Sequence, residues 1–471
     1  MFVGCSGSTA HPQMGSADDA GDAQTQGGAA GQDAGEGGAT MLSAAGAAES
    51  GDGGDGGDGA ARGPGGAPEV GAAGESAEAG AAGMPGRTQA VACPSISDPV
   101  LDAAVRAALG LPSGPISLQA ALRLGSLSTA NAGVQSLAGL QCFSALTTLA
   151  VTGDPISDLT PLVALKNLTR LDLTADQVRD VTPLAELGAL QVLTLDSNPL
   201  TDATPLVGLS TLHSLELNFT KVTDLSRFSS FGAQCEVGLS GTGLSDVTPL
   251  AGLTNLTGLD VSGNQVSDVL SLQGLTGLRY LQLVGNPLTN LAPISGLTHI
   301  TDFSAGPNIS DWQDVRSLTG VETLLISPGT IAVDFSVLAE LPRLDDLTVQ
   351  RVSQRQNYVP LGSLRGLEHL VLEDDVTLTD ISFLSQNTNL VSLDILGAGV
   401  ADISVLADLP GLNYVGLEND RVTDLTPLVQ NRSLANGANV ILTEDPIDCT
   451  AQAANIQTLT ARGVLVSSDC P

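Results

Sequence analysis

A segment with a period of 22 residues recurs along most of this chain. It reads LTRLDLTADQVRDVTPLAEL from Leu168, LQVLTLDSNPLTDATPLVGL from Leu190 and LRYLQLVGNPLTNLAPISGL from Leu278. The shared pattern is LxxLxLxxNx(I/V/L)xDxTPLxxL. A unit this short cannot bury its own leucines, so adjacent copies must stack to form one continuous core. The chain is therefore constrained to a solenoid.

The aspartate of the DxTPL segment sets the register of the copies. It recurs every 22 residues from Asp158 to Asp268, Asn290 takes the next slot, and spacings of 21 to 23 continue to Asp424. Ser136 fills the slot in an imperfect first turn. The pattern predicts about fourteen turns between residues 134 and 446.

Each copy carries signals for a strand and then a short helical turn. Alternate side chains of a strand point to opposite faces, so Leu190, Leu193 and Leu195 are expected to point inward. The following asparagine, as at Asn198, can pair loop backbone groups of its own and the adjacent turn, and aspartate or threonine can do part of that job elsewhere. In TPLxxL we expect the threonine to cap the helical turn and the proline to take its first position. These residues are structural, and we assign no catalysis to them.

The motif LxxLxLxxNxIxDLxPL in this many copies resembles the 22-residue leucine-rich repeats of the bacterial internalin family, over residues 96 to 471. The resemblance implies an α/β leucine-rich-repeat solenoid with a curved parallel sheet on its concave face and short 3₁₀ turns on its convex face. It also implies a helical N-terminal cap. Internalins bind host receptors through exposed aromatic residues on the concave face, whereas here that face is nearly free of aromatics.

The segment from 93 to 145 is predicted to cap the first turn, which would otherwise expose its leucines. Asp98 and Pro99 are typical of a helix start, and Gly110 of its end. A second short helical piece is expected from 115 to 124. Cys93 and Cys142 bracket this cap; we expect them to form a disulfide, the alternative being two free thiols.

A second cap is predicted over residues 434 to 471. It consists of a last strand at 439–442, a helix from 450 to 462 and a closing strand at 464–466. We expect Ala454, Ile456 and Leu459 to face inward from the helix. Cys449 and Cys470 are expected to form a disulfide that closes this cap, whereas Cys235 is expected to be an unpaired thiol.

The N-terminal 92 residues carry no repeat. Residues 1–5 end in Gly4-Cys5 and resemble a bacterial lipobox, so we expect a lipid on Cys5 and a true start upstream of the given one. Residues 6–92 are rich in glycine, alanine and acids and contain no aromatic residue. Such a segment buries too little apolar surface to order itself, so we expect a disordered linker. The expected location is the bacterial envelope or the outside of the cell, as an outer-membrane lipoprotein.

Composition excludes several classes of function. A net charge of −33 argues against nucleic acid as a partner. No run of 18 apolar residues predicts a transmembrane helix. No catalytic triad, metal-ligand spacing or phosphate loop can be placed, so we expect no enzyme activity, no cofactor and no metal. The sequence predicts a monomer.

The outward positions of the strands are the only ones that packing leaves free. We interpret this surface as the binding face for an unknown protein or glycan ligand, with Tyr280 and Tyr414 as aromatic anchors. The alternative is a structural envelope spacer or a self-associating lipoprotein without a ligand. The candidate ligand-binding residues are Arg170, Asp172, Asp196, His213, Glu216, Asn218, Asp260, Arg279, Tyr280, Gln282, His369, Asp394, Tyr414 and Glu418.

Overall fold

The computed structural model describes residues 93, 95–230 and 236–470. All described residues belong to one compact unit, residues 89–471. Cys5, the segment from 6 to 92 and Cys235 lie outside the described residues, so the hypotheses about them stay predictions.

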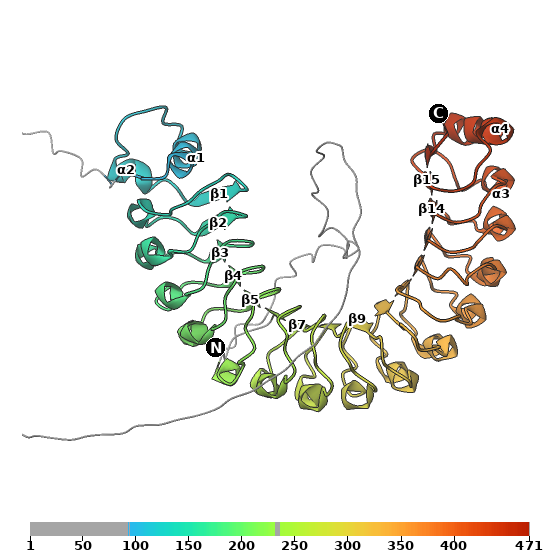
Figure 1. Ribbon diagram of the computed structural model, residues 1–471, viewed down its shortest axis with the longest axis horizontal. Coiled ribbons are helices and arrows are strands. Elements are labelled where there is room, and N and C mark those ends of the chain that lie inside the picture. The colour runs from blue at the N-terminus through green and yellow to red at the C-terminus, as the bar shows by residue number, and fades with distance from the viewer. Residues whose placement is uncertain (1–92, 94, 231–235, 471) are drawn as a thin grey trace, which may run out of the picture. The chain divides into compact units, whose positions relative to one another are not determined.

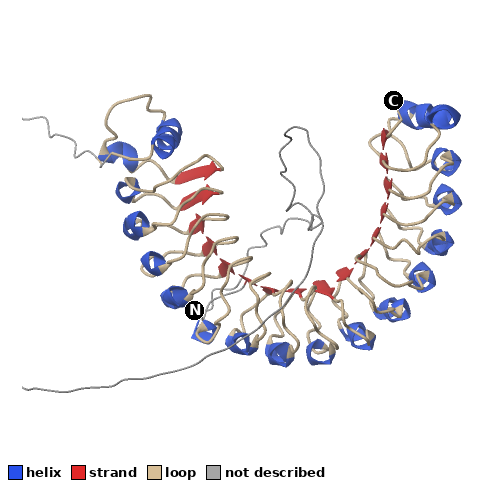
Figure 2. Ribbon diagram, viewed as in Figure 1, coloured by secondary structure: helices blue, strands red, loops and turns tan. Residues whose placement is uncertain are grey.

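A parallel sheet of sixteen strands runs through this unit in chain order. Each strand pairs with the next in register, as Leu171 does with Leu193 and Leu193 with Leu215. Figure 2 shows the strands along the inner side of an arc and the helical turns along its outer side. The strands are β1 (Ser126–Ala130), β2 (Thr148–Thr152), β3 (Arg170–Asp172), β4 (Val192–Thr194), β5 (Ser214–Glu216), β6 (Glu236–Gly238), β7 (Gly258–Asp260), β8 (Tyr280–Gln282), β9 (Asp302–Ala305), β10 (Thr323–Ile326), β11 (Asp346–Val349), β12 (His369–Glu373), β13 (Ser392–Leu396), β14 (Tyr414–Glu418), β15 (Asn439–Leu442) and β16 (Leu465–Ser468).

Short helical turns connect the strands on the convex side (Figure 1). All but the last are 3₁₀ turns. They are η1 (Leu140–Cys142), η2 (Thr160–Ala164), η3 (Thr182–Leu184), η4 (Thr204–Gly208), η5 (Phe228–Ser230), η6 (Thr248–Gly252), η7 (Leu270–Gly274), η8 (Ala292–Ile294), η9 (Gln313–Ser317), η10 (Phe335–Glu340), η11 (Val359–Ser363), η12 (Ser382–Gln386) and η13 (Ser404–Asp408), followed by the α-helix α3 (Thr426–Gln430). The predicted leucine-rich-repeat solenoid is confirmed.

The leucines of the motif form the core between the two layers. Leu190, Leu193 and Leu195 are fully buried, as predicted, and so is Leu206 from the convex turn. One continuous apolar core runs from Ile96 to Val464. Full burial of a leucine contributes about 1.5–3 kcal/mol, so the stack of turns is held chiefly by this core.

In most helical turns the first backbone N–H donates to an aspartate two residues earlier, and threonine does not cap the turn as we expected. In η3 the backbone N–H of Thr182 donates to Asp180 Oδ1 at 2.8 Å. Asp158 and Asp202 accept in the same way from the residue two positions later. Threonine lies inside the turn, one position too late to cap it, and this explains why an aspartate sets the register of the repeat.

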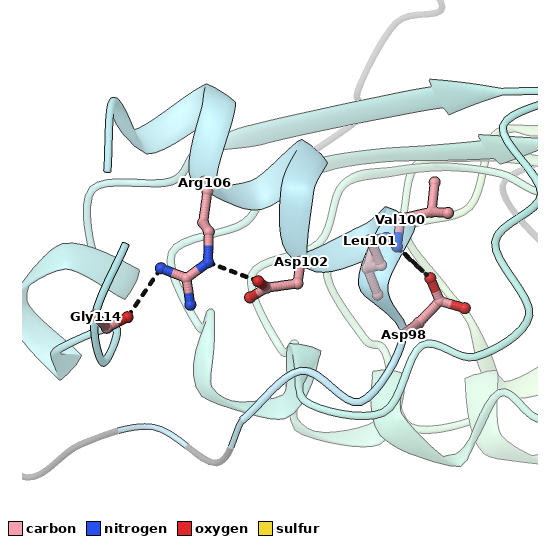
Figure 3. A network of polar contacts seen from close by, with 6 residues as sticks. All are labelled: Asp98, Val100, Leu101, Asp102, Arg106 and Gly114. Atoms are coloured by element: carbon pink, nitrogen blue, oxygen red, sulfur yellow. Dashed lines mark hydrogen bonds and ion pairs between the residues drawn. The ribbon is translucent and has the colours of Figure 1, made fainter. Parts of the chain in front are cut away.

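The N-terminal cap contains α1 (Pro99–Leu109) and α2 (Leu118–Ala121). Figure 3 shows Asp98 capping α1: its Oδ1 accepts from the backbone N–H of Val100 at 2.9 Å and of Leu101 at 3.0 Å. Its Oδ2 accepts from the N–H of Gln135 at 2.7 Å, which ties the cap to the first turn. The second helical piece is shorter than expected, and β1 already belongs to the sheet before residue 134.

Arg106 connects α1 to the loop that precedes α2. Its Nε donates to Asp102 Oδ2 at 2.6 Å, and its Nη1 donates to the carbonyl of Gly114 at 2.9 Å (Figure 3). A disulfide joins Cys93 to Cys142, with Cα atoms 5.7 Å apart.

The C-terminal cap consists of β15, the helix α4 (Cys449–Ala461) and β16. The predicted disulfide between Cys449 and Cys470 is present. Leu459 is fully buried and Ile456 partly buried, but Ala454 is exposed, so that expectation was wrong. Five residues at 100° each place Ala454 far around the helix from Leu459.

Candidate functional site: the concave face

The concave face is made by the side chains that flank the central leucine of each strand. In β3, Leu171 is buried while Arg170 and Asp172 point to the other side of the sheet, because alternate residues of a strand face opposite ways. Parallel pairing in register then places equivalent positions of successive strands in rows across the face. Asp172, Thr194, Glu216, Gly238, Asp260 and Gln282 form one such row.

The structure divides the predicted site residues into two groups. One group lies on or beside β3 to β8, and the other on β12 to β14. The first contains Arg170, Asp172, Asp196, His213, Glu216, Asn218, Asp260, Arg279, Tyr280 and Gln282; the second contains His369, Asp394, Tyr414 and Glu418.

Four carboxylates crowd together in the first group. We name Asp196, Glu216, Glu236 and Asp260 the central acidic cluster. Burial raises the pKa of Glu216 to about 8, with Asp196, Asp260 and Glu236 adding repulsion. Burial likewise raises the pKa of Asp196 to about 6 and raises that of Asp260. The charges that raise the pKa of Glu216 all come from acidic residues, so they favour its protonated form.

A glycine makes room for the most perturbed of these carboxylates. A Cβ on Gly238 would collide with Glu216 Oε2 and would lie 2.8 Å from Asn218 Nδ2. Asn218 Nδ2 donates to Glu216 Oε2 at 3.0 Å and to Asp196 Oδ2 at 3.3 Å. One amide thus holds two carboxylates side by side over the backbone of β6.

Tyr280 stands at the edge of the central acidic cluster. Burial raises its pKa, and the charges of Asp260, Asp302 and Glu216 add to this. Its neighbour Gln282 is only 3% exposed and donates its side-chain amide to Asp302 Oδ1 at 2.7 Å. Gln282 therefore stabilises the surface beside Tyr280, and little of its side chain is accessible to a ligand.

The second group repeats the arrangement on a smaller scale. A Cβ on Gly416 would collide with Asp394 Oδ1, so this carboxylate also lies over a glycine. The hydroxyl of Tyr414 donates to Asp394 Oδ2 at 3.5 Å. Burial raises the pKa of Tyr414 to about 12, with Asp394 and Glu418 as further causes.

Sequence reasoning missed Phe219 and the role of Gly238. Phe219 follows β5, has a φ of 56° and leaves 65% of its surface exposed. Its ring lies against Gly241, where a Cβ would be 2.7 Å from ring Cδ1. Glycine or serine fills the equivalent slot at 197, 241, 263 and 285, so a bulky aromatic there was the available signal.

Metal and membrane features are absent from the described residues. No group of three or more His, Cys, Asp or Glu side chains within 93–470, the gaps excepted, is arranged to hold a metal ion. Among the same residues, no helix has the length and apolar character needed to cross a bilayer.

Comparison with solved structures identifies the architecture. The functional domain of InlJ from Listeria monocytogenes is 24% identical, covers 78% of this chain and 78% of that one, and has a TM-score of 0.53. A leucine-rich-repeat protein of Leptospira interrogans is 18% identical over 74% of this chain and 97% of that one, with a TM-score of 0.56. Internalin C2 of Listeria monocytogenes is 31% identical over 44% of this chain and 92% of that one, with a TM-score of 0.43. This chain has the leucine-rich-repeat fold that is seen in these bacterial proteins.

No family model matches the chain, and neither does any curated protein. The internalin-like fold therefore rests on the repeats themselves and on the shared architecture. On the concave face of this chain, the half-buried carboxylates of Glu216 and Asp394 lie over glycines.

Proposed function

We propose that this protein acts without catalysis and binds a protein ligand on its concave face, and that the ligand presents basic side chains to the central acidic cluster. The supporting observation is the crowding of Glu216 among Asp196, Asp260 and Glu236. Half-buried like charges repel one another in the free protein. An arginine or lysine from a ligand relieves that repulsion and is drawn in by the net negative field.

Aromatic side chains beside the cluster supply the apolar part of the interface. Tyr280 lies within range of the Asp260 and Glu216 charges, and Phe219, which follows Asn218 in the chain, is exposed. Aromatic residues at the centre of an interface carry a large share of its binding energy. The proposed contact surface is therefore Phe219, Tyr280 and the four carboxylates.

We also propose that the protein works outside the cytoplasm. Disulfides close both caps, Cys93–Cys142 and Cys449–Cys470, and such bonds persist in oxidising compartments. A lipid on Cys5 and a flexible segment from 6 to 92 would hold the array at the envelope. Labelling with a palmitate analogue in the native host tests the anchor: absence of label on Cys5 would refute it.

The ligand test compares two double variants in which the same number of carboxyl groups is replaced by amides. E216Q/D260N removes two carboxylates of the central acidic cluster, whereas E186Q/E340Q removes two from exposed positions that ion-pair with Lys166 and Arg316. The full chain and both variants are used to capture proteins from the host envelope and its surroundings, and the affinity of the main captured protein is then measured.

We expect E216Q/D260N to bind this ligand at least about tenfold more weakly, as truncation of interfacial charges does. E186Q/E340Q should bind like the wild type, and binding of the wild type should weaken with salt. Equal affinity of the two variants would contradict the proposal. If the chain serves only as a spacer, neither double variant should change which proteins are captured or how tightly they bind.

A further inference from the structure

One position of the repeat points into the core from the loop after each strand. We name it the ladder position. It is buried, and it is filled by a polar residue in most turns. Its buried polar members include Asp154, Asp176, Asn198, Thr220, Thr242, Asn264, Asn286, Asp420 and Asp445.

Every member with a side-chain donor uses it in the same way. The donor pairs with the backbone carbonyl three residues earlier, as Asn198 Nδ2 does with Leu195 at 3.0 Å and Thr220 Oγ1 with Leu217 at 2.6 Å. Thr242, Asn264 and Asn286 make the same bond at 3.0, 2.9 and 3.0 Å. These bonds pair buried carbonyls, which are costly to leave unpaired. Some of these carbonyls also accept from the ladder residue of the next turn, as Leu173 does from Asn198 Nδ2 at 2.7 Å.

The aspartates keep the acceptor half of this pattern. Asp176 Oδ1 accepts from the N–H of Asp154 at 2.8 Å, and Asp420 Oδ1 from the N–H of Ala398 at 3.0 Å. Asn198 Oδ1 also accepts from the preceding turn, at 2.8 Å from the N–H of Val178, two positions after the ladder residue Asp176. The second carboxyl oxygen, Oδ2, is buried without a hydrogen-bond partner in Asp154, Asp176, Asp420 and Asp445.

We propose that Asp176 and Asp420 are protonated at Oδ2 and donate this proton to the carbonyls of Leu173 and Leu417, so that both ends of the array are held by acid-dependent bonds. An ionised carboxylate has no donor, and its Oδ2 would face a carbonyl oxygen with like partial charge. The turns from Asn198 to Asn286, whose ladder residues are amides or alcohols, lack this dependence.

The charges around both aspartates favour the protonated form. Asp154 and Asp172 act on Asp176, and Asp445 and Asp394 act on Asp420; all four are acidic. Burial is the largest cause, and it raises the pKa of each carboxyl from 3.8 to about 7. A raised folded-state pKa contributes stability that is complete below 3.8 and is lost as the pH rises through about 7.

Hydrogen exchange of three backbone amides in the full chain tests the inference. The N–H groups of Asp154 and Ala398 report on Asp176 and Asp420, and that of Val178 reports on Asn198. After correction for intrinsic exchange, we expect protection at Asp154 and Ala398 to fall by about tenfold between pH 6 and pH 8. Protection at Val178 should not change.

Reciprocal variants show whether the ladder carboxyl is the cause. D176N should leave protection at Asp154 independent of pH, and D420N should do so at Ala398. N198D should confer the same pH dependence on Val178. Constant protection at Asp154 and Ala398 in the wild type would overturn the proposal, as would an N198D variant without pH dependence. If D176N does not fold, D420N and N198D decide the matter.

Discussion

The Glu216 carboxylate fills the space beside Gly238 that any other residue would use for its Cβ. These two residues face each other across neighbouring strands, β5 and β6. The glycine thereby lets the side chain of Glu216 lie flat against the sheet, where burial raises its pKa to about 8. A small residue and an acid thus act together to place a proton-binding group on an acidic surface.

Substitution of Gly238 by alanine should drive Glu216 out of this space. The added methyl collides with Oε2 and approaches Asn218 Oδ1 to 2.9 Å, so the carboxylate must turn toward solvent. Its pKa should then fall from about 8 toward the ordinary 4.5. A carboxyl-carbon NMR titration of Glu216 measures the change. G274A is the control, because no atom lies within 4 Å of that Cβ; an unchanged pKa in G238A would show that the contact does not govern Glu216.

The aspartates that cap the convex turns should make the fold sensitive to acid. Asp180 accepts from Thr182, whose side-chain and backbone hydrogen bonds lower the pKa of Asp180. A lowered folded-state pKa contributes stability above 3.8 that is lost as the pH falls through the folded value. D180A should therefore have a lower urea midpoint than the wild type at neutral pH, and the difference should shrink in acid. D180N keeps an acceptor oxygen, so its urea midpoint should lie between those of D180A and the wild type and should not show this pH dependence. If the urea midpoints of D180A and the wild type differ by the same amount at every pH, the charge of Asp180 has no role.

The repeat was predictable from sequence because its period is tied to packing. Leu190, Leu193 and Leu195 are buried as the alternation required, and the chain order of strands follows from stacking alone. The helix start at Asp98 was also predictable, since an N-cap is a local interaction. Local interactions such as the N-cap, together with a core that repeats in every turn, therefore account for the architecture.

The details of the surface were not predictable in the same way. The burial of Gln282 and the position of Glu216 over Gly238 depend on the neighbouring strand, 20 or more residues away in sequence. Thr182 was expected to cap its turn because threonine is a common cap, but Asp180, two positions earlier, accepts the hydrogen bond from the Thr182 N–H. The sequence indicated an acidic concave face. Only the register of the paired strands showed which of its acidic residues lie close together.

Removal of the Cys449–Cys470 disulfide should loosen the C-terminal cap and leave the central turns intact. The two cysteines are 21 residues apart, and the chain-entropy estimate for a loop of that length is about 3 kcal/mol. The bond holds the start of α4 to the residues after β16, the last strand of the sheet. In C449A/C470A, hydrogen exchange should accelerate in α4 and β16, while protection near Leu193 stays as in the wild type, since each turn contacts only its neighbours. C93A/C142A is the matched control and should affect α1 instead. Loss of protection near Leu193 in either variant would mean that the array unfolds as one unit and that its caps are not local structures.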